Sequence, residues 1–376
     1  MKKVKLGEIC EIVTGSTPKS SNPNYWNGEY KWITPAEISD DDFIVFDTQR
    51  KITKLGIEET GLKSFPTGTV LLSSRAPIGK VAISGCEMYC NQGFKNFICS
   101  NKINNEYLYY FFKSRKNYLN ILGRGATFKE ISKSIVSDIE IFLPTYGIQR
   151  KQVKVLKKID KLIYTRKEQL IEFEYLVKSR FNEMFILSDF SLKRLGELVD
   201  EVRYGTSLPA TINGKYGYLR MNNITENGKL NIQNLKHIDI PEKDLEKYVV
   251  RKGDVLFNRT NSIELVGKTC IYELDFDMVI AGYIIRIRTN NNILNPRYLS
   301  EFLNFPSTKK FLRNIAKGAV NQANINAKEL QDISIPLAPL SLQNEFADFV
   351  AQVDKSQFAC QIVIKLWRNS LKSSII

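Results

Sequence analysis

Residues 148–185 read IQRKQVKVLKKIDKLIYTRKEQLIEFEYLVKSRFNEMF, without a proline or a glycine. Apolar side chains recur there at intervals close to three and four residues, at Leu156, Ile159, Ile163, Leu170, Phe173, Val177 and Met184. This spacing places them on one face of a helix, and a continuous helix of this length would extend roughly 57 Å. The stretch therefore predicts a long helix whose apolar face must be covered by another surface.

The end of the sequence repeats this pattern. From about Leu342 onward the apolar positions are Phe346, Val350, Val353, Cys360, Val363 and Trp367. Pairing of the two helices as a coiled coil would bury both apolar faces, and packing of each helix on its own domain is the alternative. Because the two domain-and-helix units follow one another in the chain, pseudo-twofold pairing would make the helices antiparallel and place the domains at opposite ends.

An internal duplication connects the two helices with the rest of the chain. Similar strings recur in one order about 190 residues apart, far beyond the period of a solenoid repeat. The matched pairs are Leu6-Gly7-Glu8-Ile9 with Leu195-Gly196-Glu197-Leu198, Gly79-Lys80-Val81-Ala82-Ile83 with Gly267-Lys268-Thr269-Cys270-Ile271, Asp138-Ile139-Glu140-Ile141 with Asp332-Ile333-Ser334-Ile335, and Gln149 with Gln343.

The duplication predicts an α+β fold with two similar mixed α/β domains, each followed by a helix. Short apolar runs after Gly68 and Gly253, and the alternation over residues 284–288, favour strands, whereas residues 105–113 favour a helix. We expect the domains at residues 1–145 and 192–338, and the spacer helices at residues 146–191 and 339–376.

Composition points to a polyanionic partner. The chain carries 54 Lys and Arg against 40 Asp and Glu, a formal net charge of +14, which favours a nucleic acid.

The six cysteines lack a paired spacing and the only histidine, His237, has no cysteine near it, so we expect reduced thiols and no metal site. Without a signal peptide or an apolar run of about 18 residues, we expect a cytoplasmic protein outside the membrane.

The order of several further motifs resembles the specificity subunits of type I restriction-modification enzymes over nearly the whole chain. In the first copy the motifs are Gly15-Ser16-Thr17-Pro18, Tyr25-Trp26-Asn27-Gly28, Ser73-Ser74-Arg75-Ala76-Pro77-Ile78-Gly79 and Asn91-Gln92-Gly93-Phe94-Lys95. In the second they are Arg203-Tyr204-Gly205-Thr206-Ser207, residues 218–224, residues 253–262 and Asn321-Gln322-Ala323-Asn324-Ile325-Asn326. The family's entry to the helix is present at Pro339-Leu340-Ser341-Leu342-Gln343, whereas the first copy departs from it with Pro144-Thr145-Tyr146-Gly147-Ile148-Gln149.

The resemblance implies two target-recognition domains that read the halves of an asymmetric bipartite site in double-stranded DNA, joined by helices that set the distance between the halves. It also implies two adenine methyltransferase (modification) subunits as partners and, for cleavage, ATP-driven restriction (motor-nuclease) subunits. S-adenosylmethionine, ATP and Mg²⁺ are expected on those subunits, and no cofactor is expected on this chain.

Reading bases in the major groove requires side chains with fixed donor and acceptor patterns, such as Arg for guanine and Asn or Gln for adenine. Arg75 and Arg259 occupy nearly matching places, seven residues after Gly68 and six after Gly253, on polar turns that follow apolar strands. A salt bridge or a solvated loop is the alternative for these arginines, and an ordinary turn for the asparagines. The predicted DNA-binding set is Ser74, Arg75, Lys80, Gln92, Lys95, Arg124, Arg220, Asn222, Asn223, Arg259, Thr260, Asn261, Asn321, Gln322 and Asn324.

The sequence lacks the motifs of the enzymes that act with such a subunit. An adenine methyltransferase needs an Asn/Asp-Pro-Pro-aromatic motif and a glycine-rich cofactor loop, and an ATP motor needs a Gly-x4-Gly-Lys-Ser/Thr loop. We therefore expect a binding protein without catalytic residues. A stand-alone nucleic-acid enzyme and a protein scaffold that does not bind DNA are the alternatives.

Overall fold

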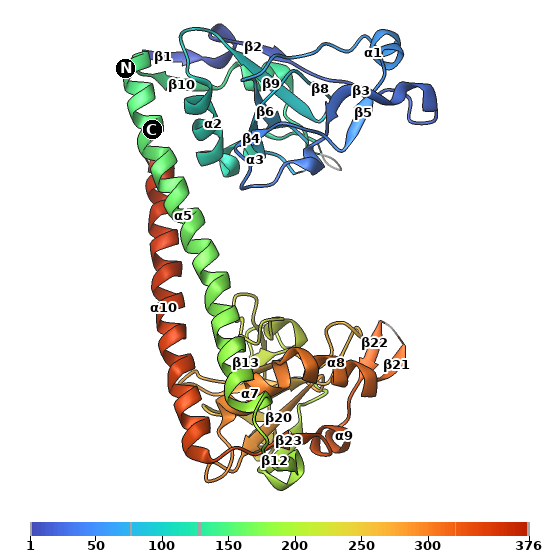
Figure 1. Cartoon of the computed structure of the whole chain (residues 1–376), viewed down its shortest axis with the longest axis vertical. Coiled ribbons are helices and arrows are strands. Elements are labelled where there is room, and N and C mark those ends of the chain that lie inside the picture. The colour runs from blue at the N-terminus through green and yellow to red at the C-terminus, as the bar shows by residue number, and fades with distance from the viewer. Residues whose placement is uncertain (1, 76, 126–128, 320, 374–376) are drawn as a thin grey trace. The chain divides into compact units, whose positions relative to one another are not determined.

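The computed structural model describes residues 2–75, 77–125, 129–319 and 321–373 (Figure 1). The chain forms two compact units, Met1–Glu168 with Cys360–Ile376, and Gln169–Ala359. Each unit holds one mixed α/β domain together with parts of two long helices. Ala76, in the predicted polar turn, and residues 374–376, at the end of the predicted second spacer helix, lie outside the described residues.

Domain 1 comprises strands β1 to β10 and the elements between them. Among the described residues, β2-β9-β6-β7-β4 form one sheet, β5-β3-β8 form another, and β1 pairs with β10. The strands are β1 (Lys2–Lys5), β2 (Cys10–Val13), β3 (Trp26–Ile33), β4 (Ile44–Val45), β5 (Arg50–Ile52), β6 (Val70–Ser73), β7 (Val81–Ser84), β8 (Tyr89–Cys90), β9 (Phe94–Cys99) and β10 (Glu140–Leu143). The helices are α1 (Lys54–Thr60), α2 (Asn105–Ser114), α3 (Lys116–Leu122) and α4 (Lys133–Ser137), with 3-10 turns η1 (Leu6–Glu8), η2 (Pro23–Tyr25) and η3 (Pro35–Glu37).

Domain 2 comprises strands β11 to β23. Its described residues form the sheets β12-β20-β16-β18, β14-β13-β19-β15 and β17-β22-β21, and the pair β11-β23. The strands are β11 (Leu192–Arg194), β12 (Val199–Tyr204), β13 (Tyr216–Leu219), β14 (Lys236–Ile238), β15 (Val249–Val250), β16 (Val255–Asn258), β17 (Thr260–Asn261), β18 (Thr269–Ile271), β19 (Met278–Ile280), β20 (Ile284–Thr289), β21 (Lys317–Ala319), β22 (Gln322–Asn324) and β23 (Ser334–Pro336). The helices are α6 (Glu242–Tyr248), α7 (Pro296–Asn304), α8 (Pro306–Ile315) and α9 (Ala327–Gln331), with 3-10 turns η5 (Leu195–Glu197) and η6 (Met221–Asn223).

The two domains share one topology, which confirms the predicted duplication. The ladder β2-β9-β6-β7 in domain 1 corresponds to β12-β20-β16-β18 in domain 2. In the second sheet β3 runs parallel to β8 and antiparallel to β5, just as β13 runs parallel to β19 and antiparallel to β14. In both domains the first strand pairs with the last, so the chain enters and leaves each domain at the same edge.

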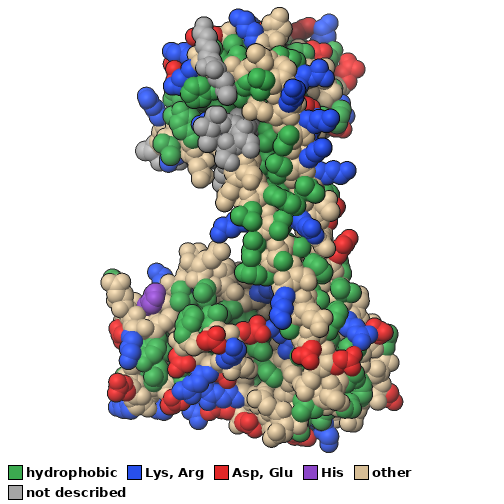
Figure 2. Space-filling model, turned by 90° about the vertical axis from the view of Figure 1, so that its left-hand side faces the viewer, with side chains coloured by type: hydrophobic (Ala, Val, Ile, Leu, Met, Phe, Trp, Pro, Cys, Tyr) green, Lys and Arg blue, Asp and Glu red, His purple; other side chains and the backbone are tan. Residues whose placement is uncertain are grey.

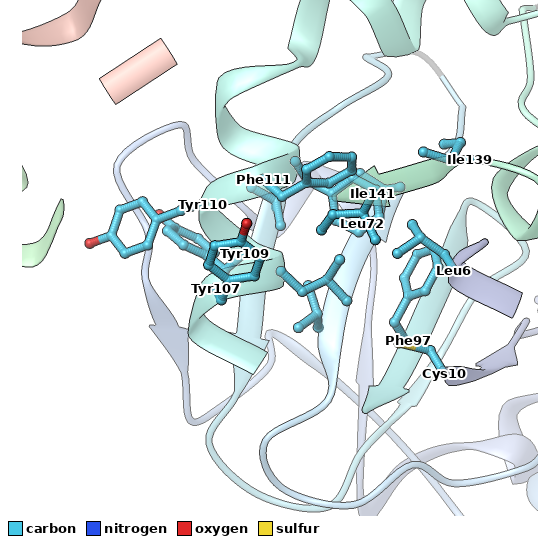
Figure 3. Packing of buried hydrophobic residues seen from close by; sticks show 14 of the residues in the cluster. Leu6, Cys10, Leu72, Phe97, Tyr107, Tyr109, Tyr110, Phe111, Ile139 and Ile141 are labelled. Carbon is cyan, nitrogen blue, oxygen red and sulfur yellow. The ribbon is translucent and has the colours of Figure 1, made fainter. Parts of the chain in front are cut away.

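The core of domain 1 lies between its main sheet and helix α2. Asn104 caps this helix by accepting a 3.0 Å hydrogen bond from the Tyr107 backbone N–H, which satisfies a donor that a helix start leaves unpaired. The apolar side chains of α2 then pack on strands β6 and β7, and the Phe112 ring of α2 lies 4.9 Å from the Phe97 ring of β9. Figure 3 shows Phe111 of α2 beside Leu72 and Ile141, which belong to the same buried cluster.

The long helices are α5 (Tyr146–Phe181) and α10 (Leu340–Ser373) (Figure 1). The predicted helix over residues 148–185 ends its regular α geometry at Phe181 and continues as a π turn, η4 (Asn182–Ile186). Helix α5 starts in the first unit and ends in the second, whereas α10 runs the other way, so the two helices are antiparallel where they pack together. In the second unit the Phe181 ring lies 5.2 Å from the Phe346 ring.

The apolar stripes of these helices cover both a domain and the partner helix. Of the predicted coiled-coil positions, Leu156, Ile163, Phe346, Val350 and Val353 are buried, and Ile159, Leu170, Phe173, Val177 and Trp367 are half-buried. Leu156 belongs to the core of domain 1, against which Leu371 of α10 packs, and Phe346 and Val350 belong to the core of domain 2. The two arrangements that the sequence left open therefore occur together.

A buried glutamine fixes each long helix to its domain. The Gln149 side chain accepts a 2.8 Å hydrogen bond from the Asn104 N–H and donates to the carbonyl oxygens of Lys102 and Pro144 at 3.0 and 2.9 Å. The Gln343 side chain makes the same set, with the Asn295 N–H at 2.8 Å and the carbonyls of Ile293 and Ala338 at 3.0 and 2.8 Å. The divergent helix entry of the first copy thus leaves this joint unchanged.

Across the described part of the chain, no helix is both long enough and apolar enough to span a bilayer.

Candidate nucleic-acid interface

A glycine motif shapes a loop next to the main sheet of each domain. A Cβ atom at Gly15 would lie 1.8 Å from the carbonyl oxygen of Cys90, and one at Gly205 would lie 2.3 Å from that of Ile280. The next residue in each copy donates its backbone N–H to the same carbonyl, Ser16 at 3.1 Å and Thr206 at 2.9 Å. Glycine is required because the backbone approaches strand β8 or β19 too closely for any side chain.

In both domains a buried aromatic side chain donates a hydrogen bond to this loop. The indole N–H of Trp32 donates to the Ser16 carbonyl at 3.2 Å, and the Tyr218 hydroxyl donates to the Thr206 carbonyl at 3.1 Å. Both rings are buried. Trp32 and Trp26, whose ring centroids lie 5.0 Å apart, therefore belong to the packing of domain 1.

Beside the first loop lies a polar cavity of about 630 Å³. It brings together three residues of the predicted set, Gln92, Lys95 and Arg124. The Gln92 side chain accepts a 2.5 Å hydrogen bond from the Thr17 hydroxyl of the glycine motif. The complete lining is Thr14, Gly15, Gln92, Lys95, Arg124, Glu130, Ser132, Lys133, Ser134 and Ile135.

Glu130, which the predicted set omits, pairs with Lys95 of this cavity and with Arg75, which is outside the cavity lining. Its carboxylate accepts a 2.9 Å hydrogen bond from Arg75 Nε and lies 3.2 Å from Lys95 Nζ, which also donates to the Ser74 hydroxyl at 3.2 Å. Lys95 is almost completely buried, and a buried ammonium is costly unless it is paired. Burial raises the pKa of the Glu130 carboxyl, but the hydrogen bonds and charges of Lys95 and Arg75 outweigh burial and hold this pKa below its usual range.

Domain 2 has a corresponding cavity of about 830 Å³. It brings together five predicted residues, and within it the Thr260 hydroxyl donates to the side-chain oxygen of Asn324 at 2.9 Å. The Arg259 guanidinium lies 4.7 Å above the Tyr204 ring, close enough for a cation–π contact. The predicted residues in the lining are Arg220, Arg259, Thr260, Gln322 and Asn324.

The strand register corrects the correspondence that the sequence suggested between Arg75 and Arg259. Leu72 faces Lys95 across β6 and β9, and Phe257 faces Ile285 across β16 and β20. Two residues further along each chain segment, the Ser74 N–H donates to the Gly93 carbonyl and the Arg259 N–H to the Tyr283 carbonyl. Arg259 is therefore equivalent to Ser74, and Arg75 is equivalent to Thr260. The difference between seven and six residues after the reference glycines was the visible sign of this shift.

Several predicted residues serve the scaffold around the cavities. The Lys80 ammonium donates to the Pro35 carbonyl at 3.0 Å, and the equivalent Lys268 donates to the Met221 carbonyl at 3.0 Å. The buried Asn223 side chain caps η6 by accepting from the Arg220 N–H, and the Asn261 side chain donates to Asn258. Ser74 is buried, whereas Asn222 and Asn321 are exposed and lie outside the lining of the second cavity.

The arrangement provides hydrogen-bond donors and acceptors with a predominance of cations. Such a surface can bind phosphates and base edges. Within the described ranges, no group of three or more His, Cys, Asp or Glu side chains is placed to hold a metal ion.

A family model described as type I restriction modification DNA specificity domain matches residues 1–174 and again residues 188–362. The specificity subunit of the MjaIX type I restriction enzyme of Methanocaldococcus jannaschii is 35% identical over 228 residues, which cover 54% of this chain and 52% of that protein. The StySPI specificity subunit of Salmonella potsdam is 24% identical over 304 residues, or 74% of this chain and 65% of that protein. The matched region thus spans about half the length of the Methanocaldococcus relative.

Solved structures share the fold over the whole chain. A chain from a type I R-M system, described for its complex assembly and conformational transition, aligns with a TM-score of 0.65 at 20% identity and covers 100% of this chain and 96% of that chain. The S subunit of a type I restriction-modification system from M. genitalium aligns with a TM-score of 0.54 at 15% identity and the same coverage. At these identities the likeness concerns the fold.

Proposed function

Because the chain belongs to the family of type I restriction-modification DNA specificity proteins, we propose that it is the subunit that reads the DNA target of such a complex and that it is not itself a catalyst. One observation carries the proposal. Each copy of the duplicated domain has a polar cavity beside the same glycine loop, and each cavity gathers residues with the chemistry of base recognition.

The two cavities have different chemistry, which supports an asymmetric bipartite target. Domain 1 presents Gln92, Lys95 and Arg124 together with the carboxylate of Glu130. Domain 2 presents Arg220 and two amides, Gln322 and Asn324. Because donor and acceptor patterns determine which base edge fits, different linings select different half-sites.

The long helices provide a surface for the partner subunits. Ile148, Val155, Leu162 and Leu176 of α5 are exposed and are separated by multiples of seven residues. Figure 2 shows hydrophobic side chains exposed along the helices. An apolar stripe with heptad spacing is the surface onto which another helix packs. We assign this apolar stripe to the binding of two adenine methyltransferase subunits.

S-adenosylmethionine, ATP and Mg²⁺ then belong to the methyltransferase and restriction subunits.

The test is to map adenine methylation in cells that contain the methyltransferase subunits with and without this chain. The expected result is one bipartite, non-palindromic methylated motif that requires the chain. A palindromic motif, or no change in methylation, would contradict the proposal. If the isolated protein cleaved or methylated DNA, it would be an enzyme in its own right, and an assembled complex without sequence preference would identify it as a scaffold.

A further inference from the structure

Glu130 occupies a position where the two domains differ in charge. The Glu130 backbone pairs with that of Arg124, and the next residue, Ile131, donates its N–H to the Ser74 carbonyl at 2.9 Å. In domain 2 the Ile325 N–H donates to the Arg259 carbonyl at 2.9 Å, so Asn324 is the counterpart of Glu130. One cavity therefore carries a carboxylate where the other carries a neutral amide.

A carboxylate in a DNA-binding surface weakens the attraction of that surface for phosphates. The charge of Glu130 repels phosphates and also occupies Arg75, an exposed cation that DNA would otherwise attract. In the major groove, however, a carboxylate is a good acceptor for the exocyclic amino group of cytosine, and adenine presents an amino group as well. About a third of the Glu130 side chain is exposed to the cavity, so it is accessible to such a group.

We propose that Glu130 is a specificity-determining residue of domain 1, which accepts a hydrogen bond from an exocyclic amino group of cytosine or adenine in the half-site. This inference rests on the proposed function. Before DNA binds, the same carboxylate holds Arg75 and Lys95 in ion pairs and thereby weakens binding to DNA that lacks the target. Glu130 thus increases the difference in affinity between target and other DNA in two ways: it strengthens binding to the target and weakens binding to other DNA.

The test compares the assembled complex with methyltransferase subunits, as wild type and as Glu130→Gln, Glu130→Asp and Glu58→Gln. Glu130→Gln keeps the size of the side chain and removes its charge. Glu58 lies on α1, outside the cavity, so Glu58→Gln controls for the loss of one negative charge. Affinity for target and for unrelated duplex DNA is measured over a range of salt concentrations, and the methylated motif is mapped in cells.

For Glu130→Gln we expect tighter binding to unrelated DNA, a slope of log affinity against log salt that is steeper by about one, and a loss on the order of tenfold in discrimination at one position of one half-site. The base at that position identifies the amino group as that of cytosine or of adenine. The other half-site should stay unchanged, which also shows that the protein is folded. Glu130→Asp, which keeps the charge, should bind unrelated DNA like the wild type.

A wild-type complex without sequence-specific methylation would refute the proposed function itself. A second outcome would overturn only the role of Glu130. In that outcome the wild-type complex methylates a specific motif, and the Glu130→Gln variant keeps both the same half-site and the same affinity for unrelated DNA. Equal effects of Glu130→Gln and Glu58→Gln would also overturn it, because net charge would then explain both.

Discussion

Gln149 and Gln343 show how a single side chain can join two elements. Each one is fully buried and makes hydrogen bonds to three backbone groups of its domain, so the first turn of the helix and the loop before α2 or α7 are held together. The glutamine side chains themselves are fully buried, and a buried polar group left unsatisfied costs about 1–3 kcal/mol.

We predict that Gln149→Leu lowers the free energy of unfolding by about 2–4 kcal/mol, because the Asn104 N–H and two carbonyls lose their partner. Gln343→Leu should have an effect of similar size in the other unit. Urea denaturation measures both, with the exposed Gln352→Leu on α10 as a control that should change stability by less than about 0.5 kcal/mol. Losses no larger than that of the control would show that the joint carries no stability.

For the two arginines we predict separate effects on recognition. Arg75→Ala should weaken discrimination in one half-site and Arg259→Ala in the other, by about 1–3 kcal/mol if each side chain makes a bidentate guanine contact, while methyltransferase binding survives. Competition between duplexes with single base changes measures this. A variant that loses its partner subunits but keeps its base preference would place that arginine on the wrong surface.

Ion pairs between elements connect each domain to a long helix. In the pair Lys167–Asp41 of the first unit the helix carries the cation, whereas in the pair Lys229–Asp354 of the second unit the domain carries it. In the first unit the Asp41 carboxylate of the domain accepts from Lys167 of α5 at 2.6 and 2.8 Å. In the second unit Lys229 of the domain donates to Asp354 of α10 at 3.0 Å. Hydrogen bonding to Lys167 lowers the pKa of the Asp41 carboxyl below its usual value.

We predict that Lys167→Met destabilises the protein at pH 7 by less than about 1 kcal/mol, since the pair is exposed and screened by solvent. A carboxyl whose pKa is lower in the folded state stabilises the fold above its unfolded pKa, and this contribution disappears as pH falls through the folded pKa. The difference between variant and wild type should therefore shrink below about pH 4 and in about 1 M salt. A difference independent of pH and salt would mean that Lys167 acts through packing.

At the scale of the whole molecule, α5 is the segment through which the chain passes from the first unit to the second. Inserting four residues between Arg166 and Gln169 adds about one turn, or roughly 6 Å, and nearly preserves the apolar stripe. We predict that the unread spacer of the methylated motif grows by one to two base pairs of about 3.4 Å each, with both half-sites unchanged. Motif mapping in cells measures the spacer.

Two other outcomes of this insertion are informative. An unchanged spacer would mean that the helix absorbs the extra turn as a bulge, because only one of the paired helices was lengthened. An altered half-site would mean that α5 contacts bases, which would contradict the division between reading domains and spacing helices.

Features that depend on local periodicity and on repetition could be predicted from the amino-acid sequence. The heptad spacing from Leu156 to Val177 predicted α5. The recurrence of Leu6-Gly7-Glu8-Ile9 and of the strings that follow it about 190 residues later predicted two domains of one topology. These predictions succeed because helix faces and strand alternation are properties of neighbouring residues, and because a duplicated sequence folds into duplicated structure.

Contacts between residues far apart in the chain became apparent only in the folded domains. The pairing of β6 with β9 and of β16 with β20 showed that Arg75 matches Thr260, and the return of the chain at residue 130 brought a carboxylate between Arg75 and Lys95. The alignment of Glu130-Ile131-Ser132 with Asn324-Ile325-Asn326 was the available signal, but a sequence spacing does not reveal which strands pair. Strand register and the contacts of a side chain across more than fifty residues depend on the packing of the whole domain, and no local pattern records them.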